Sequence, residues 1–164
     1  GEYFAQSLQQ DGLEFDMLYG PAYKGIPIAT AISTAYYKLF KRNIPVAFNR
    51  KEVKDHGEGG VLIGAPLKGK VLIVDDVVSA GTSVRESIKM IQDSGAEVAG
   101  ISVALDRQEK GKGNLSASAE LEAEYGINVQ SIIDLNSLIE FSQKNSEFQA
   151  HVLELEEYRD NWGA

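Results

Sequence analysis

Apolar positions along the chain fall into two alternating patterns: short continuous runs, and longer segments in which they recur at helical spacing. The continuous runs predict β-strands, because a strand covered on both faces carries apolar side chains at successive positions. These strands are predicted at residues 15–19, 44–48, 71–74, 98–105 and 129–133. The run from Val71 to Val74 is wholly apolar, which is typical of a central parallel strand.

Helices are predicted between these strands. Val84, Ile88 and Ile91 recur at helical spacing before Gly95, which predicts a helix over residues 82–93. Other helices are predicted at residues 27–41, 116–125, 135–144 and 147–159, with the tail of one at residues 1–12. Residues 49–60 contain seven ionisable side chains and three glycines without periodicity, which predicts a solvated, mobile loop.

The alternation of strands and helices predicts an α/β fold, with a mainly parallel sheet flanked by helices and right-handed crossovers. A length of 164 residues without a visible linker predicts a single domain over residues 1–164. Ligands of such sheets bind at the carboxyl ends of the strands. The residues that follow the predicted strands are therefore the candidates for chemistry.

Composition narrows the classes of function. The absence of Cys excludes disulfides and thiolate metal sites, and the net charge of −8 argues against binding to nucleic acid. The sequence shows neither a signal-peptide pattern nor an apolar segment long enough to span a bilayer, so we expect no membrane association and a cytoplasmic location. Basic residues gather at 50–54 and 107–112, which fits either small anionic ligands or two solvated loops.

The most informative segment spans residues 71–83, in which an apolar strand leads into Asp75 and Asp76, a loop of small residues and a helix. A helix start presents free N–H groups and a positive dipole end, which suit a phosphate. The small and hydroxyl residues of the loop suit close approach by that anion, and the two acids suit sugar hydroxyls or a Mg²⁺ ion held through water. Alternatively, the acids only end a strand and Ser79 or Thr82 only caps a helix.

Three further segments carry cations beside predicted strand ends. In residues 19–27, glycines bracket a turn that exposes Lys24, which is otherwise an ordinary surface lysine. Residues 48–60 supply Arg50, Lys51, Lys54 and His56, which suit an anionic ligand, although a lone His is often only solvated.

Arg107, in the third segment, residues 105–111, has a fork that suits a carboxylate or a base carbonyl. The alternative is a surface arginine paired with Glu109. Residues 64–70 read G-x-x-x-x-G-K, but Val71 follows them and they precede a strand, so we exclude a nucleotide-binding P-loop and place Gly69 in a turn.

Residues 71–83 resemble the phosphoribosyl-pyrophosphate (PRPP) signature of type I phosphoribosyltransferases. The other three segments resemble the pyrophosphate loop, the catalytic loop and the base-contacting strand end of the orotate phosphoribosyltransferase family. The resemblance implies a Mg-assisted enzyme that converts orotate and PRPP to orotidine 5′-monophosphate and pyrophosphate in pyrimidine nucleotide synthesis. The alternatives are a type I enzyme for a purine or uracil, or a regulator that binds ligand without turnover.

The resemblance also implies roles for individual residues. Catalysis falls to Lys54, Asp75 and Asp76, and orotate contacts to Ser79 and Arg107. The metal has no direct protein ligand and is held mainly by pyrophosphate and water. The residues implied to bind PRPP are Tyr23, Lys24, Arg50, Lys51, Lys54, His56, Asp75, Asp76, Val77, Val78, Ser79, Ala80, Gly81, Thr82 and Ser83.

Two expectations concern the assembly. Members of the family are homodimers, which implies that residues 49–60 act in the neighbouring subunit's site. They also carry an N-terminal hood over the site, which gives orotate a lysine and an aromatic contact. Nothing before Phe15 matches that hood, so we expect a fragment that keeps a PRPP site, binds orotate poorly and turns over slowly.

Overall fold

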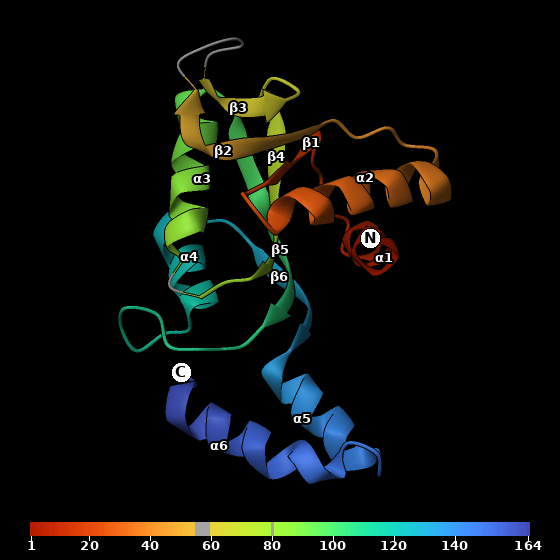
Figure 1. Ribbon diagram of the computed structural model, residues 1–164, viewed down its shortest axis with the longest axis vertical. Helices are drawn as coiled ribbons and strands as arrows, with labels where there is room; N and C mark the ends of the chain where they lie inside the picture. Colours follow the sequence, from red (N-terminus) through yellow and green to blue (C-terminus); the bar gives the residue numbers. More distant parts are fainter. Residues whose placement is uncertain (55–59, 80) are drawn as a thin grey trace.

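The computed structural model of the chain describes residues 1–54, 60–79 and 81–164, whose helices and strands form three layers (Figure 1). The central layer is a sheet in the order β3-β2-β1-β4-β5-β6. Its strands are β1 (Met17–Gly20), β2 (Val46–Lys54), β3 (Gly60–Gly64), β4 (Lys70–Val77), β5 (Glu97–Asp106) and β6 (Val129–Asp134). Neighbouring strands are parallel except β2 and β3, which confirms the predicted α/β class with a mainly parallel sheet.

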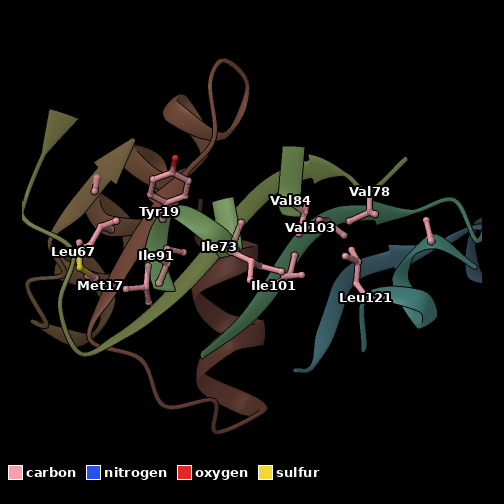
Figure 2. Close-up of a cluster of buried hydrophobic side chains, with 14 residues drawn as sticks. Met17, Tyr19, Leu67, Ile73, Val78, Val84, Ile91, Ile101, Val103 and Leu121 are labelled. Atoms are coloured by element: carbon pink, nitrogen blue, oxygen red, sulfur yellow. The ribbon is translucent and has the colours of Figure 1, made fainter. Parts of the chain in front are cut away.

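Helices cover both faces of the sheet (Figure 1). Helices α1 (Glu2–Gln10) and α2 (Gly25–Phe40) pack on one face, and α3 (Thr82–Asp93) and α4 (Ala117–Tyr125) on the other. Because successive side chains of a strand point to opposite faces, Leu72 packs with α1 and α2 while Ile73 packs with α3 and α4. Figure 2 shows the buried cluster on the face that α3 and α4 cover, where Tyr19 and Ile73 of the sheet are drawn with Ile91 of α3 and Leu121 of α4.

Local signals fix the helix starts near the sheet edge. The hydroxyl of Ser116 accepts from the N–H of Ala119 at 3.1 Å and begins α4. The carboxylate of Asp134 accepts from the N–H of Ser137 at 2.7 Å and begins α5 (Leu135–Lys144) directly after β6. These are the side-chain caps that an N-terminus favours, since they satisfy otherwise free N–H groups.

The predicted helices agree with the structure over residues 82–93 and 135–144. The helix predicted at 27–41 begins two residues earlier, at Gly25, and ends at Phe40, where Lys41 turns left-handed with φ 57°. The helix predicted at 147–159 was placed too early. A short 3₁₀ turn, η1 (Gln149–His151), precedes α6 (Val152–Trp162), which packs with α5 beyond the sheet (Figure 1).

The predicted loop at residues 49–60 is wrong for its first half. Strand β2 continues to Lys54 and pairs antiparallel with β3, a strand that the apolar pattern did not predict. Arg50 is half-buried and Lys51 exposed, so the hairpin is defined by backbone pairing rather than by side-chain burial. Because this part of β2 is rich in ionisable residues, apolar periodicity does not predict it as a strand. Residues 55–59 lie outside the described part of the chain.

Candidate active site

Asp75 and Asp76 lie side by side near the end of β4 and differ in their ionisation. The N–H of Asp76 donates to Oδ1 of Asp75 at 2.9 Å. Burial raises the pKa of Asp75 to about 6, with a further contribution from the charge of Asp76. Burial also opposes ionisation of Asp76, but the hydrogen bond and charge of Lys24 outweigh it and lower the pKa of Asp76 below its usual value. The pair thus offers one firmly ionised carboxylate and one that is readily protonated.

Lys24 reaches this acidic pair from the start of α2. Its Nζ lies 2.5 Å from Oδ2 of Asp76, and this hydrogen bond raises the pKa of Lys24. The side chain is nonetheless 73% exposed, so the ammonium group can turn toward a ligand. A lysine at a helix N-terminus is unfavourable without an anion, and in this structure the carboxylate of Asp76 supplies that anion.

A tight turn brings Lys24 to β4. The N–H of Gly25 donates to the carbonyl of Pro21 at 3.0 Å. A Cβ on Gly20 would lie 2.2 Å from the carbonyl oxygen of Gly25, and one on Gly25 would lie 2.8 Å from that of Val74. Only glycine allows this approach, which confirms the prediction that glycines bracket a turn presenting Lys24.

The loop after β4 and the start of α3 enclose a cavity of about 380 Å³ that is also lined by the acidic pair and Lys24. Gly81, with φ 72°, stands at the N-cap of α3, and none of the described side chains caps this helix. The alternative that Ser79 or Thr82 serves only as a cap is therefore wrong. The N–H groups and positive dipole end of α3 therefore lie beside a cavity with room for a phosphate.

The structure brings most of the predicted phosphate-site residues to this cavity. Ala80 lies outside the described residues, so its predicted contact stays a prediction. The predicted residues that line the cavity are Tyr23, Lys24, Asp75, Asp76, Val77, Val78, Ser79, Gly81, Thr82 and Ser83.

A second cavity, of about 680 Å³, adjoins the first and shares Thr82 and Ser83 with it. Arg50 and Lys51 of β2 line it, and Nζ of Lys51 lies 4.8 Å from the centre of the Tyr23 ring. Two of the predicted loop cations thus lie beside the phosphate cavity. The backbone of Lys54 pairs with Gly60, whereas the position of its side chain and the whole of His56 lie outside what the structure describes.

Arg107 follows β5 and does not line the phosphate cavity within the described residues. Its Nη2 lies 3.1 Å from Oε2 of Glu109, so the alternative ion pair exists, although the Arg107 side chain is only 34% exposed. Lys24 is held mainly by Asp76, and the positive charge of Arg107 is among the smaller influences that lower its pKa. Arg107 lies outside the lining of the phosphate cavity, in an ion pair with Glu109.

Some features of the site were not predicted from the sequence, and one exclusion was confirmed. Asn49 accepts from the N–H of Ala22 at 2.8 Å and ties β2 to the Lys24 turn. Tyr158 donates to Glu109 from α6, 49 residues away. A single Asn or Tyr without a motif carries no signal for either contact.

The P-loop exclusion is confirmed, since Gly64 ends β3, Gly69 turns with φ 66° and Lys70 begins a strand.

Within the described residues, no three His, Asp or Glu side chains gather as a metal-ion site. The acidic pair offers hard carboxylate oxygens of the kind that Mg²⁺ prefers, but two adjacent carboxylates are too few to enclose the ion. No described helix combines the length and apolar character needed to cross a bilayer.

A parallel sheet with an acidic pair leading into an uncapped helix start is the arrangement of a phosphoribosyltransferase. Residues 1–117 match the family model described as "Phosphoribosyl transferase domain". Orotate phosphoribosyltransferases are similar along almost the whole chain. The Actinobacillus pleuropneumoniae enzyme is 53% identical over 99% of this chain and 76% of its own, and that of Cronobacter sakazakii is 50% identical over the same shares.

Solved structures agree. Orotate phosphoribosyltransferase of Francisella tularensis superposes with a TM-score of 0.82 at 34% identity, covering 99% of this chain and 77% of its own. The Mycobacterium tuberculosis enzyme in complex with PRPP gives a TM-score of 0.64 at 26% identity, covering 84% and 75%. The chain therefore belongs to the orotate phosphoribosyltransferase family.

Proposed function

We propose that this chain transfers the phosphoribosyl group of PRPP to orotate, giving orotidine 5′-monophosphate and pyrophosphate in pyrimidine nucleotide biosynthesis. Its family membership supports the reaction, since the relatives carry that enzyme's name and one was solved with PRPP. The observation that carries the proposal is the cavity where Asp75, Asp76 and Lys24 meet the uncapped start of α3. One small space thus holds groups for a sugar, a phosphate and a departing anion.

The acidic pair acts on the ribose. The anomeric carbon gains positive charge as pyrophosphate departs, and carboxylates fixed nearby stabilise that charge more than they stabilise the ground state. Asp76 is the firmly ionised member, whereas Asp75, with a pKa of about 6, is the member that can share a proton with a ribose hydroxyl. We assign both to orienting the ribose hydroxyls.

The 5′-phosphate binds at the start of α3. Ser79, Thr82 and Ser83 line the cavity and carry hydroxyl donors, while Gly81 lets the anion approach the backbone. The N–H groups of the first helical turn and the helix dipole add fixed positive potential. Val77, Val78 and Ala80 complete this segment, and Ser79 also faces the base.

The leaving group is neutralised by cations. Lys24 turns from Asp76 to the pyrophosphate, with Tyr23 beside it, and Arg50, Lys51, Lys54 and His56 of the segment 49–60 add positive charge. We assign Lys54 to catalysis, because charge that develops on pyrophosphate is best met by a cation placed for the transition state. The segment acts in the partner subunit's site of a homodimer.

Magnesium would be held mainly by pyrophosphate and water, and Asp75 and Asp76 are the residues of this chain that would contact it through water. When bound, the ion supplies neutralisation of pyrophosphate charge. We place the enzyme in the cytoplasm.

A panel of bases with labelled PRPP and Mg²⁺ tests the reaction. We expect product with orotate and none with uracil or a purine. Product with a purine would assign a different type I enzyme, and binding of PRPP without product for any base would assign a ligand-binding regulator. An adenine phosphoribosyltransferase from Thermoanaerobacter pseudethanolicus shares the fold at 19% identity and a TM-score of 0.55, so the fold alone does not choose the base.

A further inference from the structure

Arg107 belongs to a chain of polar contacts that runs from the end of β5 to α6. Its Nη2 donates to Oε2 of Glu109 at 3.1 Å, and the other carboxylate oxygen of Glu109 accepts from the hydroxyl of Tyr158. This second hydrogen bond is the main reason that the pKa of Tyr158 is raised. The two oxygens of Glu109 thus connect a proposed base-binding residue to a helix outside the phosphate cavity.

The backbone fixes the middle of this chain of contacts. Residues 108–110 pair with residues 162–164: the N–H of Lys110 donates to the carbonyl of Trp162 at 2.9 Å, and that of Ala164 donates to the carbonyl of Gln108 at 3.0 Å. On its other side, the carbonyl of Glu109 accepts from the N–H of Ala117 at 2.9 Å. Glu109 is therefore held between α6 and the start of α4.

The guanidinium group of Arg107 contacts Glu109, and its charge and hydrogen bonding also act on Tyr158. Glu109 accepts a hydrogen bond from Nη2 of Arg107, whose planar fork has five N–H donors. The Nε of Arg107 is buried and lacks a hydrogen-bond partner among the described residues. Immobilising a flexible side chain at binding costs free energy, and a side chain already held in place avoids part of that cost.

We propose that Glu109 and Tyr158 are positioning residues that hold Arg107 ready for the carboxylate of the base, so that α6 contributes to orotate affinity. The inference rests on the proposed function, which assigns Arg107 to orotate. The side chain of Glu109 is only 21% exposed, and it accepts a hydrogen bond from Tyr158 of α6. Glu109 thus links Arg107 to α6.

Tyr158→Phe tests the proposal because it removes one hydroxyl and keeps the ring. We expect the KM for orotate to rise about three- to tenfold, while kcat and the KM for PRPP stay within about twofold. Glu109→Gln, which places an amide where Arg107 needs an acceptor, is expected to raise the orotate KM at least as much. Tyr3→Phe, at a tyrosine of α1 that is 78% exposed, is the matched control and should change nothing.

The outcomes separate the two proposals. An unchanged or lowered orotate KM in both Tyr158→Phe and Glu109→Gln, with the unaltered chain active on orotate, would overturn the positioning role. So would an equal loss for orotate and PRPP accompanied by a lower melting temperature, since that indicates a structural role only. The side-chain Nε–H resonance of Arg107, assigned with Arg107→Lys, gives a readout without turnover, and Tyr158→Phe should broaden it. If the unaltered chain forms no product with orotate, the proposed function fails, while the resonance still tests the contacts.

Discussion

Lys24 and Asp76, 52 residues apart in the sequence, form an ion pair in which Nζ lies 2.5 Å from Oδ2. Each partner shifts the pKa of the other. The hydrogen bond raises the pKa of Lys24, and it lowers the pKa of Asp76 although burial acts in the opposite direction. The pair joins the proposed pyrophosphate and ribose sites. On the proposed assignment, Lys24 leaves Asp76 for the pyrophosphate group when PRPP binds.

Lys24→Gln should therefore weaken PRPP binding and slow turnover. We expect the KM for PRPP to rise about tenfold or more, because the leaving group loses a cation. Lys38→Gln is a matched control, since Lys38 lies in α2, the helix that Lys24 precedes, and pairs with Glu2, also at 2.5 Å, away from the cavity. Steady-state kinetics with varied PRPP measures both, and equal effects of the two changes would contradict the assignment.

Asp75 should lower the stability of the fold at neutral pH. Its folded pKa of about 6 is above the ordinary aspartate value of 3.8, so the folded state binds more protons than the unfolded state between these values. Its contribution is most favourable below pH 3.8 and is lost as the pH rises through 6. Asp75→Asn should then raise the free energy of unfolding at pH 7.5 by ~1–3 kcal/mol and have less effect near pH 4.

Urea unfolding of both chains at the two pH values checks this, alongside turnover, which Asp75→Asn should lower. A variant that is less stable than the unaltered chain at pH 7.5 would show that Asp75 is not an unfavourably buried carboxylate. A gain in stability with a loss of activity is the pattern expected of a functional residue.

Lys54→Ala should reduce turnover far more than it reduces ground-state affinity for PRPP, because its charge serves the transition state. If the segment 49–60 acts in the partner's site, mixing this variant with Asp76→Asn restores one intact site in each mixed dimer. Random exchange would then recover about a quarter of the unaltered activity. Mixed dimers verified by two affinity tags that show no recovery would reject the shared site.

Arg107→Ala should weaken the binding of orotate far more than that of PRPP, since Arg107 does not line the phosphate cavity. Calorimetry with each ligand measures the two losses. Lys112→Ala is the control, because Lys112 is an exposed cation of the same basic stretch. Equal weakening of both ligands by Arg107→Ala would argue against a position at the base.

The sequence predicted the parts of this site that depend on local signals. The acids after β4, the small loop and α3 follow one another along the chain, so their order and spacing already place them together. The turn from Gly20 to Gly25 could also be predicted from the sequence, because close approach of two backbone segments requires glycine. The parallel strands then bring the two segments to one sheet edge.

The features missed from the sequence depend on contacts between distant segments. Strand β3 is held by pairing with a strand rich in ionisable residues, so apolar periodicity gave no sign of the hairpin. The partner of Lys24 could not be read from its neighbours, and Tyr158 reaches Glu109 across 49 residues. Such pairs become visible only when the tertiary fold is known.

Asp76→Asn tests the central claim most directly. Orotidine 5′-monophosphate and pyrophosphate are quantified together from orotate, PRPP and Mg²⁺, with the unaltered chain and with the variant. The unaltered chain should form the two products in equal amounts, and the variant should lower turnover by one to three orders of magnitude, roughly 1.4–4 kcal/mol of transition-state stabilisation. Near-normal turnover by Asp76→Asn, or pyrophosphate release without nucleotide formation by the unaltered chain, would contradict the proposed reaction at this site.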